Sequence, residues 1–149
     1  MKAASKGHMA IVDFLVDQGA QLDRQDSNGS TALMLACSGE HMSAVSKLVD
    51  AGSGLDFRNR VGKTAMYIAC WHGHLGIVQT LLTAGANPLT ANDEGETCEG
   101  VCVRMKRDAI LSLFRPGLMR VENHGLNNSA AMETPDRPFS AAPALARAE

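Results

Sequence analysis

The sequence lacks the features that mark several large classes of protein. No apolar run approaches the roughly eighteen residues of a membrane-spanning helix, and residues 1–20 hold no uninterrupted hydrophobic stretch with a credible signal-cleavage site. We therefore expect a chain without a membrane segment that lies in the cytoplasm, with the nucleus as the alternative compartment.

A strong excess of charge is also missing. The 149 residues include 14 basic and 16 acidic side chains, so the formal net charge at pH 7 is −2. No long-range field draws the whole chain to nucleic acid or to an anionic membrane. The hydrophobic content of 45% and the charged content of 20% are typical of a folded protein, and the length fits one domain.

The common catalytic and nucleotide-binding motifs are absent as well. The sequence contains no glycine-rich phosphate loop, no G-x-S-x-G and no H-E-x-x-H. It therefore predicts no enzyme, no catalytic residue, no cofactor and no small-molecule substrate. The cysteines are interpreted as buried free thiols of a reducing compartment rather than as two disulfides; they are Cys37, Cys70, Cys98 and Cys102.

What the chain does contain is an internal repeat. Gly29, Gly62 and Gly95 are spaced by 33 residues, and four further series keep the same step. These are Gly19, Gly52 and Gly85; Thr31, Thr64 and Thr97; His8, His41 and His74; and Val12, Val45, Val78 and Leu111. A fixed period of this length is typical of a solenoid, in which each unit stacks on the next and shares its core.

One unit is predicted to form two helices and a turn. Thr64 is placed to cap a short buried helix that runs to about Trp71. Gly85 follows a second helix and suits a left-handed cap. The apolar stripe of that second helix consists of Ile77, Val78, Leu81 and Leu82.

These units resemble the ankyrin repeat. Residues 29–37 read GSTALMLAC and residues 62–88 read GKTAMYIACWHGHLGIVQTLLTAGANP, close to the family pattern G-x-T-P-L-H-x-A-A followed by G-H, V-V, L-L and G-A. The resemblance implies an all-α fold, an α-solenoid of stacked helix-loop-helix repeats with hairpin-like turns. The family's Pro is replaced by Ala32, Ala65 and Cys98, and its His by Met34, Tyr67 and Gly100.

The register divides the chain into an array and a tail. The ankyrin array is predicted over residues 1–115, and residues 116–149 are predicted to be a disordered tail, with a short linear motif around ETPDRPF as the alternative. The array comprises a partial unit (1–25), two complete units (26–58 and 59–91) and a divergent capping unit (92–115). Because Met1 falls inside a first helix, we interpret the chain as a fragment whose Ile11, Val12 and Leu15 lack an N-terminal cap.

One cluster raises the question of a metal site. Cys70, His72 and His74 lie close together, and Cys37 with His41 repeats the spacing of Cys70 with His74, so four zinc ligands can be imagined. The repeat explains the same residues as a small buried position and a loop histidine, and only His72 stays unexplained. We therefore predict no metal.

The candidate binding residues are those expected to be exposed on the array. In a stacked array, the turn tips and the outer faces of the first helices are expected to line one concave surface. Trp71 is the only tryptophan and is the expected anchor; its alternative role is to cover the core against the next repeat. The predicted partner-binding residues are Trp71, His72, Arg58, Arg60, Lys63, Arg104 and Met105.

The predicted function is a monomeric, non-catalytic module that binds one or more unidentified proteins through that surface. The alternative is an ankyrin targeting fragment of a larger multidomain protein, such as an enzyme or its substrate-recognition subunit. Nucleic acid is not an expected partner, because the basic middle turn is followed by Asp93, Glu94 and Glu96.

Protein purified without chelator is expected to contain only substoichiometric zinc, because the repeat pattern accounts for the Cys and His residues of the candidate set. Elemental analysis measures the ratio of metal to chain. A full equivalent of zinc that disappears in a Cys70→Ala variant would contradict this interpretation.

Overall fold

The computed structural model describes residues 1–115, and within them the regular structure is entirely helical. The all-α class predicted from the repeat is confirmed. The predicted tail, residues 116–149, lies outside the described residues. The helices are α1 (Lys2–Lys6), α2 (Met9–Asp17), α3 (Ala32–Ser38), α4 (Met42–Asp50), α5 (Ala65–His72), α6 (Leu75–Thr83), α7 (Cys98–Arg104) and α8 (Asp108–Phe114).

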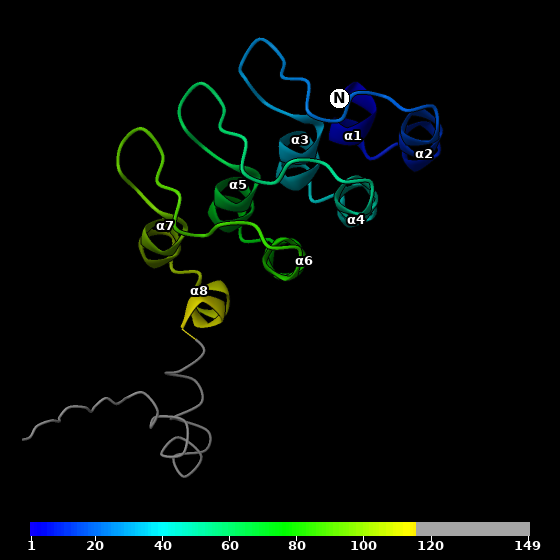
Figure 1. Cartoon of the computed structure of the whole chain (residues 1–149). Coiled ribbons are helices and arrows are strands. Elements are labelled where there is room, and N and C mark those ends of the chain that lie inside the picture. The colour runs from blue at the N-terminus through cyan, green and yellow to red at the C-terminus, as the bar shows by residue number, and fades with distance from the viewer. Residues whose placement is uncertain (116–149) are drawn as a thin grey trace, which may run out of the picture. The chain divides into compact units, whose positions relative to one another are not determined.

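The helices stand in two rows, with long turns projecting beside the first row (Figure 1). The first row holds α1, α3, α5 and α7, and the second holds α2, α4, α6 and α8. The main contacts join each helix to its partner in the same unit and to the equivalent helix of the adjacent unit. Residues 1–114 form one compact unit built in this way.

A threonine begins each first helix after α1. Thr31, Thr64 and Thr97 have extended backbones, and each Oγ1 accepts a hydrogen bond from the backbone N–H three residues later, at 3.3, 3.2 and 3.2 Å. This bond satisfies one of the amides that a helix leaves unpaired at its start. Helices of 7 or 8 residues are too short to be stable alone, so caps and packing must hold them together.

Small side chains line the contacts between neighbouring first helices. Ala36, Ala69 and Cys102 occupy equivalent positions one period apart, and each is fully buried. Cys70 beside them is fully buried too, as expected of a core thiol. Because these residues are small, the first helices approach closely and share one apolar core that runs the length of the stack.

The loop between the two helices of a unit contains a residue in the left-handed region. Gly7 and Gly73 adopt φ values of 71° and 88° there, and glycine bears no steric penalty in this conformation. Glu40 and Lys106 stand at the equivalent positions of the other units, with φ values of 61° and 56°. A side chain with a Cβ costs about 1–2 kcal/mol in this conformation, so these two loops are strained.

The long turns between units, which we call the fingers, comprise residues 18–31, 51–64 and 84–97. In each finger one side-chain oxygen organises the tip. Oδ1 of Asp26, Asn59 or Asn92 accepts hydrogen bonds from the backbone N–H groups two and four residues later. These three residues keep the 33-residue step, a signal that the predictions above missed.

Backbone hydrogen bonds also join neighbouring fingers. The Arg60 N–H donates to the carbonyl of Asn28 at 3.0 Å, and the Asp93 N–H donates to the carbonyl of Val61 at 3.2 Å. The fingers therefore project as one connected layer rather than as separate loops (Figure 1).

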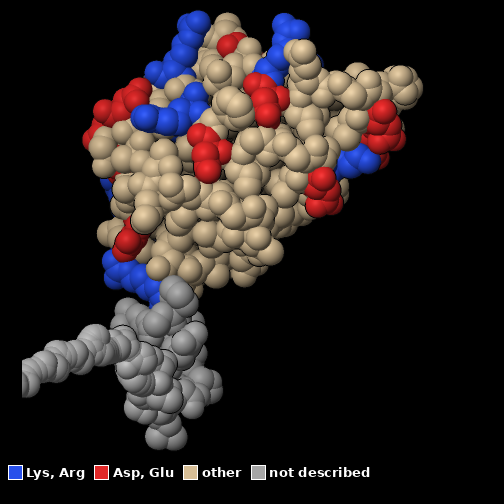
Figure 2. Space-filling view, viewed as in Figure 1, with Lys and Arg blue, Asp and Glu red and all other residues tan. Residues whose placement is uncertain are grey.

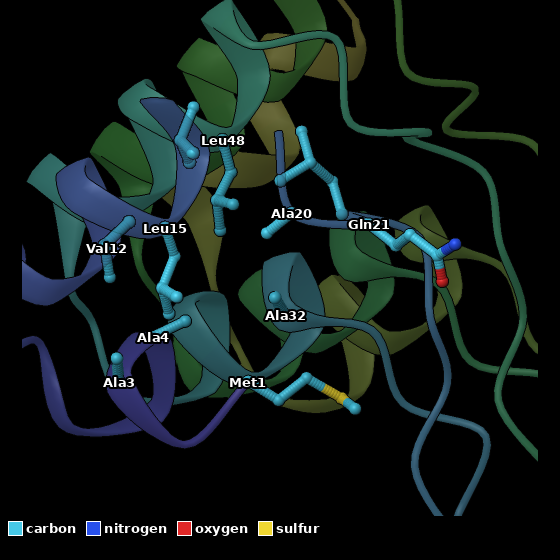
Figure 3. A pocket seen from close by; sticks show the side chains of 11 residues that line it. Met1, Ala3, Ala4, Val12, Leu15, Ala20, Gln21, Ala32 and Leu48 are labelled. Carbon is cyan, nitrogen blue, oxygen red and sulfur yellow. The ribbon is translucent and has the colours of Figure 1, made fainter. Parts of the chain in front are cut away.

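The N-terminal end of the stack leaves apolar side chains uncovered. Ile11 and Leu15 are 50% and 40% exposed, whereas their equivalents Ile77 and Leu81 are 2% and 0% exposed. Val12, which we expected to be uncovered with them, is only 4% exposed. That expectation was wrong because Val12 belongs to the buried core cluster together with Ala4 of α1 and Leu48 of α4, beside an apolar pocket that all three line (Figure 3).

An Asn59→Ala substitution is expected to lower the free energy of unfolding by about 1–2 kcal/mol, because two backbone N–H groups of the middle finger lose their acceptor. Thermal melting followed by circular dichroism measures the change. Asn28→Ala is the matched control, since no hydrogen bond to the Asn28 side chain is found within residues 1–115. Equal destabilisation by both substitutions would contradict the role given to Asn59.

Candidate protein interface

Trp71 lies at the C-terminal end of α5, one helical turn after Tyr67. The centroids of the two rings are 6.3 Å apart, and Trp71 packs partly against the core. The expectation of a solvent-facing tryptophan therefore needs correction, because the side chain is half-buried. The spacing of four residues brings both rings to the same helix face, so Tyr67 covers part of the indole.

Two cationic side chains lie over the Trp71 ring. Lys63 Nζ, from the middle finger, is 4.7 Å from the ring centroid, and Arg104 Cζ, from α7, is 4.9 Å from it. Cations at this distance are attracted by the ring's negative face, an interaction worth about 0.5–1 kcal/mol at exposed sites. Trp71 is thus the point at which the middle finger, α5 and α7 meet.

A carboxylate of the last finger, that of Glu96, joins α5 and α7. Tyr67 donates its hydroxyl hydrogen to Glu96 and accepts a hydrogen bond from Asn92 Nδ2 at 3.2 Å. Arg104 donates to the two oxygens of Glu96 at 2.7 and 2.5 Å. These donors, the guanidinium foremost, lower the pKa of Glu96 from 4.5 to about 2. Burial, and then the bond to Glu96, raises the pKa of Tyr67 to about 12.

The structure brings together Lys63, Trp71 and Arg104, three of the residues predicted to bind a partner. Met105, next to Arg104, is half-buried and packs against the core. We define the first-helix face as the exposed sides of α3, α5 and α7 with the finger residues beside them; Ser38, Lys63, Trp71 and Arg104 lie on it.

The remaining predicted residues lie farther out on the fingers. Arg58 Nη2 donates to Asp93 Oδ1 at 2.7 Å, so the basic middle finger and the acidic last finger neutralise each other there. Arg60 is exposed on the middle finger. Ser30 of the first finger, which stands at the position equivalent to Lys63, is only 9% exposed because it lies at the base of the finger, next to the Thr31 cap.

His72 is exposed beside Trp71 and bridges to the preceding unit. Its ring stacks on His74 with centroids 5.5 Å apart, and its Nε2 lies 3.5 Å from Ser38 Oγ of α3. Partial burial lowers the pKa of His72, and the positive charges of His74, Arg107 and Lys63 lower it further. The surroundings of His72 are therefore electropositive.

The histidines and cysteines considered as metal ligands have structural partners. His41 Nε2 lies 3.2 Å from the carbonyl of Ser5, and His74 Nδ1 lies 3.3 Å from the carboxylate of Glu40. Burial raises the pKa of the Cys37 thiol to about 12, which disfavours the thiolate that a metal needs. Within residues 1–115, no three His, Cys, Asp or Glu side chains are placed to hold a metal ion.

A family model of ankyrin repeats, in three copies, matches residues 1–111. The chain belongs to the ankyrin repeat family. The solenoid of helix pairs and hairpin-like turns is thereby confirmed as an ankyrin array. A search of curated proteins finds no match to the chain. None of the helices in the described part of this ankyrin protein has the length and apolar character needed to cross a bilayer.

Ankyrin repeats are generally non-catalytic modules that bind proteins. In this ankyrin array, Tyr67 stands where the family pattern has its histidine, and its hydroxyl reaches Glu96 and Asn92 of the next finger. The predictions treated Tyr67 only as a departure from the pattern. The sequence signal that could have indicated the bond of Tyr67 is Glu96, an acidic residue one position before Thr97, the cap of the next unit's first helix.

The Glu96 carboxylate is expected to make this array acid-sensitive. Its pKa in the folded state, about 2, is below the ordinary value of 4.5, so its stabilising effect is complete above pH 4.5 and is lost as the pH falls towards 2. A Glu96→Gln variant should melt at a lower temperature than the wild type at neutral pH and lose less on acidification through this window.

Melting curves recorded across that pH range test the expectation. Glu94→Gln serves as the control, because Glu94 makes no ion pair within residues 1–115. If Glu96→Gln loses as much stability as the wild type between pH 4.5 and 2, the bond network around Glu96 does not contribute as described.

Proposed function

We propose that this protein is a non-catalytic interaction module that binds a partner protein through its first-helix face. The observation that carries the proposal is the position of Trp71, half-exposed and flanked by Lys63 and Arg104. A shallow pocket opens at the ring, lined by Lys63, Tyr67, Ile68, Trp71 and His72. We further propose that the protein acts as a monomer in the cytoplasm.

The Trp71 surface has the character of a binding hot spot. The exposed part of the indole offers apolar area at low entropic cost, together with one N–H donor. That N–H donates no hydrogen bond within residues 1–115. Tyr67, Lys63 and Arg104 hold the ring in place before any partner arrives, so little conformational freedom remains to be lost on binding.

A second candidate function is that of a targeting segment within a larger multidomain protein. The exposed apolar residues Ile11, Phe14 and Leu15 on α2 favour it, since another part of such a protein would cover them. Immunoblotting of source cells with an antibody to the array decides between the two. A native polypeptide much longer than 149 residues supports the larger protein, and one of 149 residues contradicts it.

Trp71→Ala is expected to abolish recovery of the partner while the array stays folded. Removal of an interface tryptophan typically costs about 2 kcal/mol or more of binding free energy, a loss of roughly thirtyfold in affinity. The full chain is used as bait, proteins recovered by wild type and variant are compared by quantitative mass spectrometry, and melting curves confirm folding.

Gln79→Ala is the matched control, because Gln79 is exposed on α6 in the second row, away from the first-helix face. A partner recovered by the wild type and the control but not by Trp71→Ala supports the proposal. Partners that bind all three baits equally, or a Trp71→Ala variant that melts much lower while its folded fraction binds normally, would contradict it.

A further inference from the structure

Resting on the proposed function, we infer that the partner offers an acidic peptide segment, one of whose carboxylates docks at Trp71 between the Lys63 ammonium and the indole N–H. The inference rests on two observations. The Lys63 ammonium on the first-helix face has no ion pair within residues 1–115, whereas the carboxylates of Glu96 and Glu40 are already paired.

Lys63 is the first of these unpaired groups. Its ammonium lies over Trp71 at 4.7 Å and is 5.5 Å from the centroid of Tyr67, and it forms no ion pair within residues 1–115. The ring supplies only a weak partner for a full charge. The indole N–H of the same ring is a second donor without an acceptor in the described part of the chain. A carboxylate has the charge and the two acceptor oxygens that would satisfy both.

Two carboxylates of the surrounding units already have partners. Glu96 is held by two nitrogens of Arg104 and by the hydroxyl of Tyr67. Glu40 pairs with His74 at 3.3 Å. The charge of Lys63 contributes to the lowered pKa of Glu96, but that carboxylate forms its ion pair with Arg104, so Lys63 has no ion-pair partner within residues 1–115.

A further positive charge, that of Arg107, lies next to the backbone of Trp71. Arg107 Nη2 donates to the carbonyl of Trp71 at 3.2 Å, and its Nε is buried without a hydrogen-bond partner in the described residues. The charges of Arg107 and Lys63 both disfavour the protonated form of His72. A carboxylate approaching Trp71 thus meets the charges of Lys63 and Arg107 although the chain as a whole carries a net charge of −2.

The positive region is small, which favours a peptide over nucleic acid. The residues equivalent to Lys63 in the adjacent units are Ser30 and Glu96, so the charge does not continue along the stack. Basic and acidic side chains are intermixed at the finger end of the array (Figure 2). Nucleic acid binds to continuous rows of basic residues that follow its phosphates, whereas one or two carboxylates of a peptide need only a local site.

The test uses Trp71 as its own reporter, because it is the only tryptophan of the chain. A capped oligoglutamate peptide is titrated into the full chain, and tryptophan fluorescence is recorded at low and at physiological salt. Oligolysine and a single-stranded DNA oligonucleotide of equal length are titrated in parallel. We expect saturable binding of oligoglutamate that weakens with salt, and no saturable change with oligolysine.

Two variants with the same loss of charge localise the effect. Lys63→Gln is expected to weaken oligoglutamate binding at least roughly fivefold, as the loss of one charge contact does. Lys47→Gln should leave it unchanged, because Lys47 lies on α4 in the second row, where it pairs with Asp13 and Asp17. Melting curves confirm that both variants are folded.

Three results would overturn the inference: no fluorescence change with oligoglutamate, equal effects of the two lysine substitutions, or tighter binding of the DNA oligonucleotide. None of these results contradicts the proposal that the protein is an interaction module. That proposal fails only if captured partners bind the Trp71→Ala variant as well as the wild type. If a partner depends on Trp71 but oligoglutamate does not bind, the proposal of an interaction module is supported and the inference of an acidic ligand is wrong.

Discussion

The close packing of one first helix on the next is the contact on which the rest of this protein depends. A helix such as α5, with 8 residues, is too short to persist alone, and its apolar residues face the adjacent units on both sides. Small residues at equivalent positions, such as Ala36 and Ala69, allow the approach. Once the helices are fixed, the fingers are placed at a regular spacing, and their backbones can hydrogen-bond from one unit to the next.

That spacing also creates the binding face. Lys63 belongs to the middle finger, Trp71 to α5 and Arg104 to α7, and no two of them are neighbours in sequence. They meet because adjacent units are offset by one repeat, which brings the α7 side chain over the ring of the preceding unit. Glu96 then fixes Arg104 and Tyr67 in place. The surface is therefore a property of two stacked repeats and would not exist in either one.

Much of the fold was predictable because the repeat contains residues whose conformational preference is strong and local. Thr64 caps a helix and Gly85 adopts a left-handed conformation, and both effects are local to the chain. The pair Arg58–Asp93 was not predictable, since it depends on how far one finger lies from the next, and the pair Lys63–Trp71 was not predictable because it depends on side-chain rotamers. Half-burial of Trp71 was missed for the same reason, because Tyr67 and Arg104 cover it from different elements.

The nearest-neighbour pattern of contacts between helices has a consequence for how such a chain can change over generations. The main contacts of α3 reach α1, α4 and α5, and those of α5 reach α3, α6 and α7, so each unit recognises only the unit before and the unit after it. Duplication of a 33-residue segment of the gene would insert a unit whose small buried residues already match those of its new neighbours. Lengthening by whole units therefore keeps the packing of the core in register, whereas an insertion of any other length would place every later residue out of register.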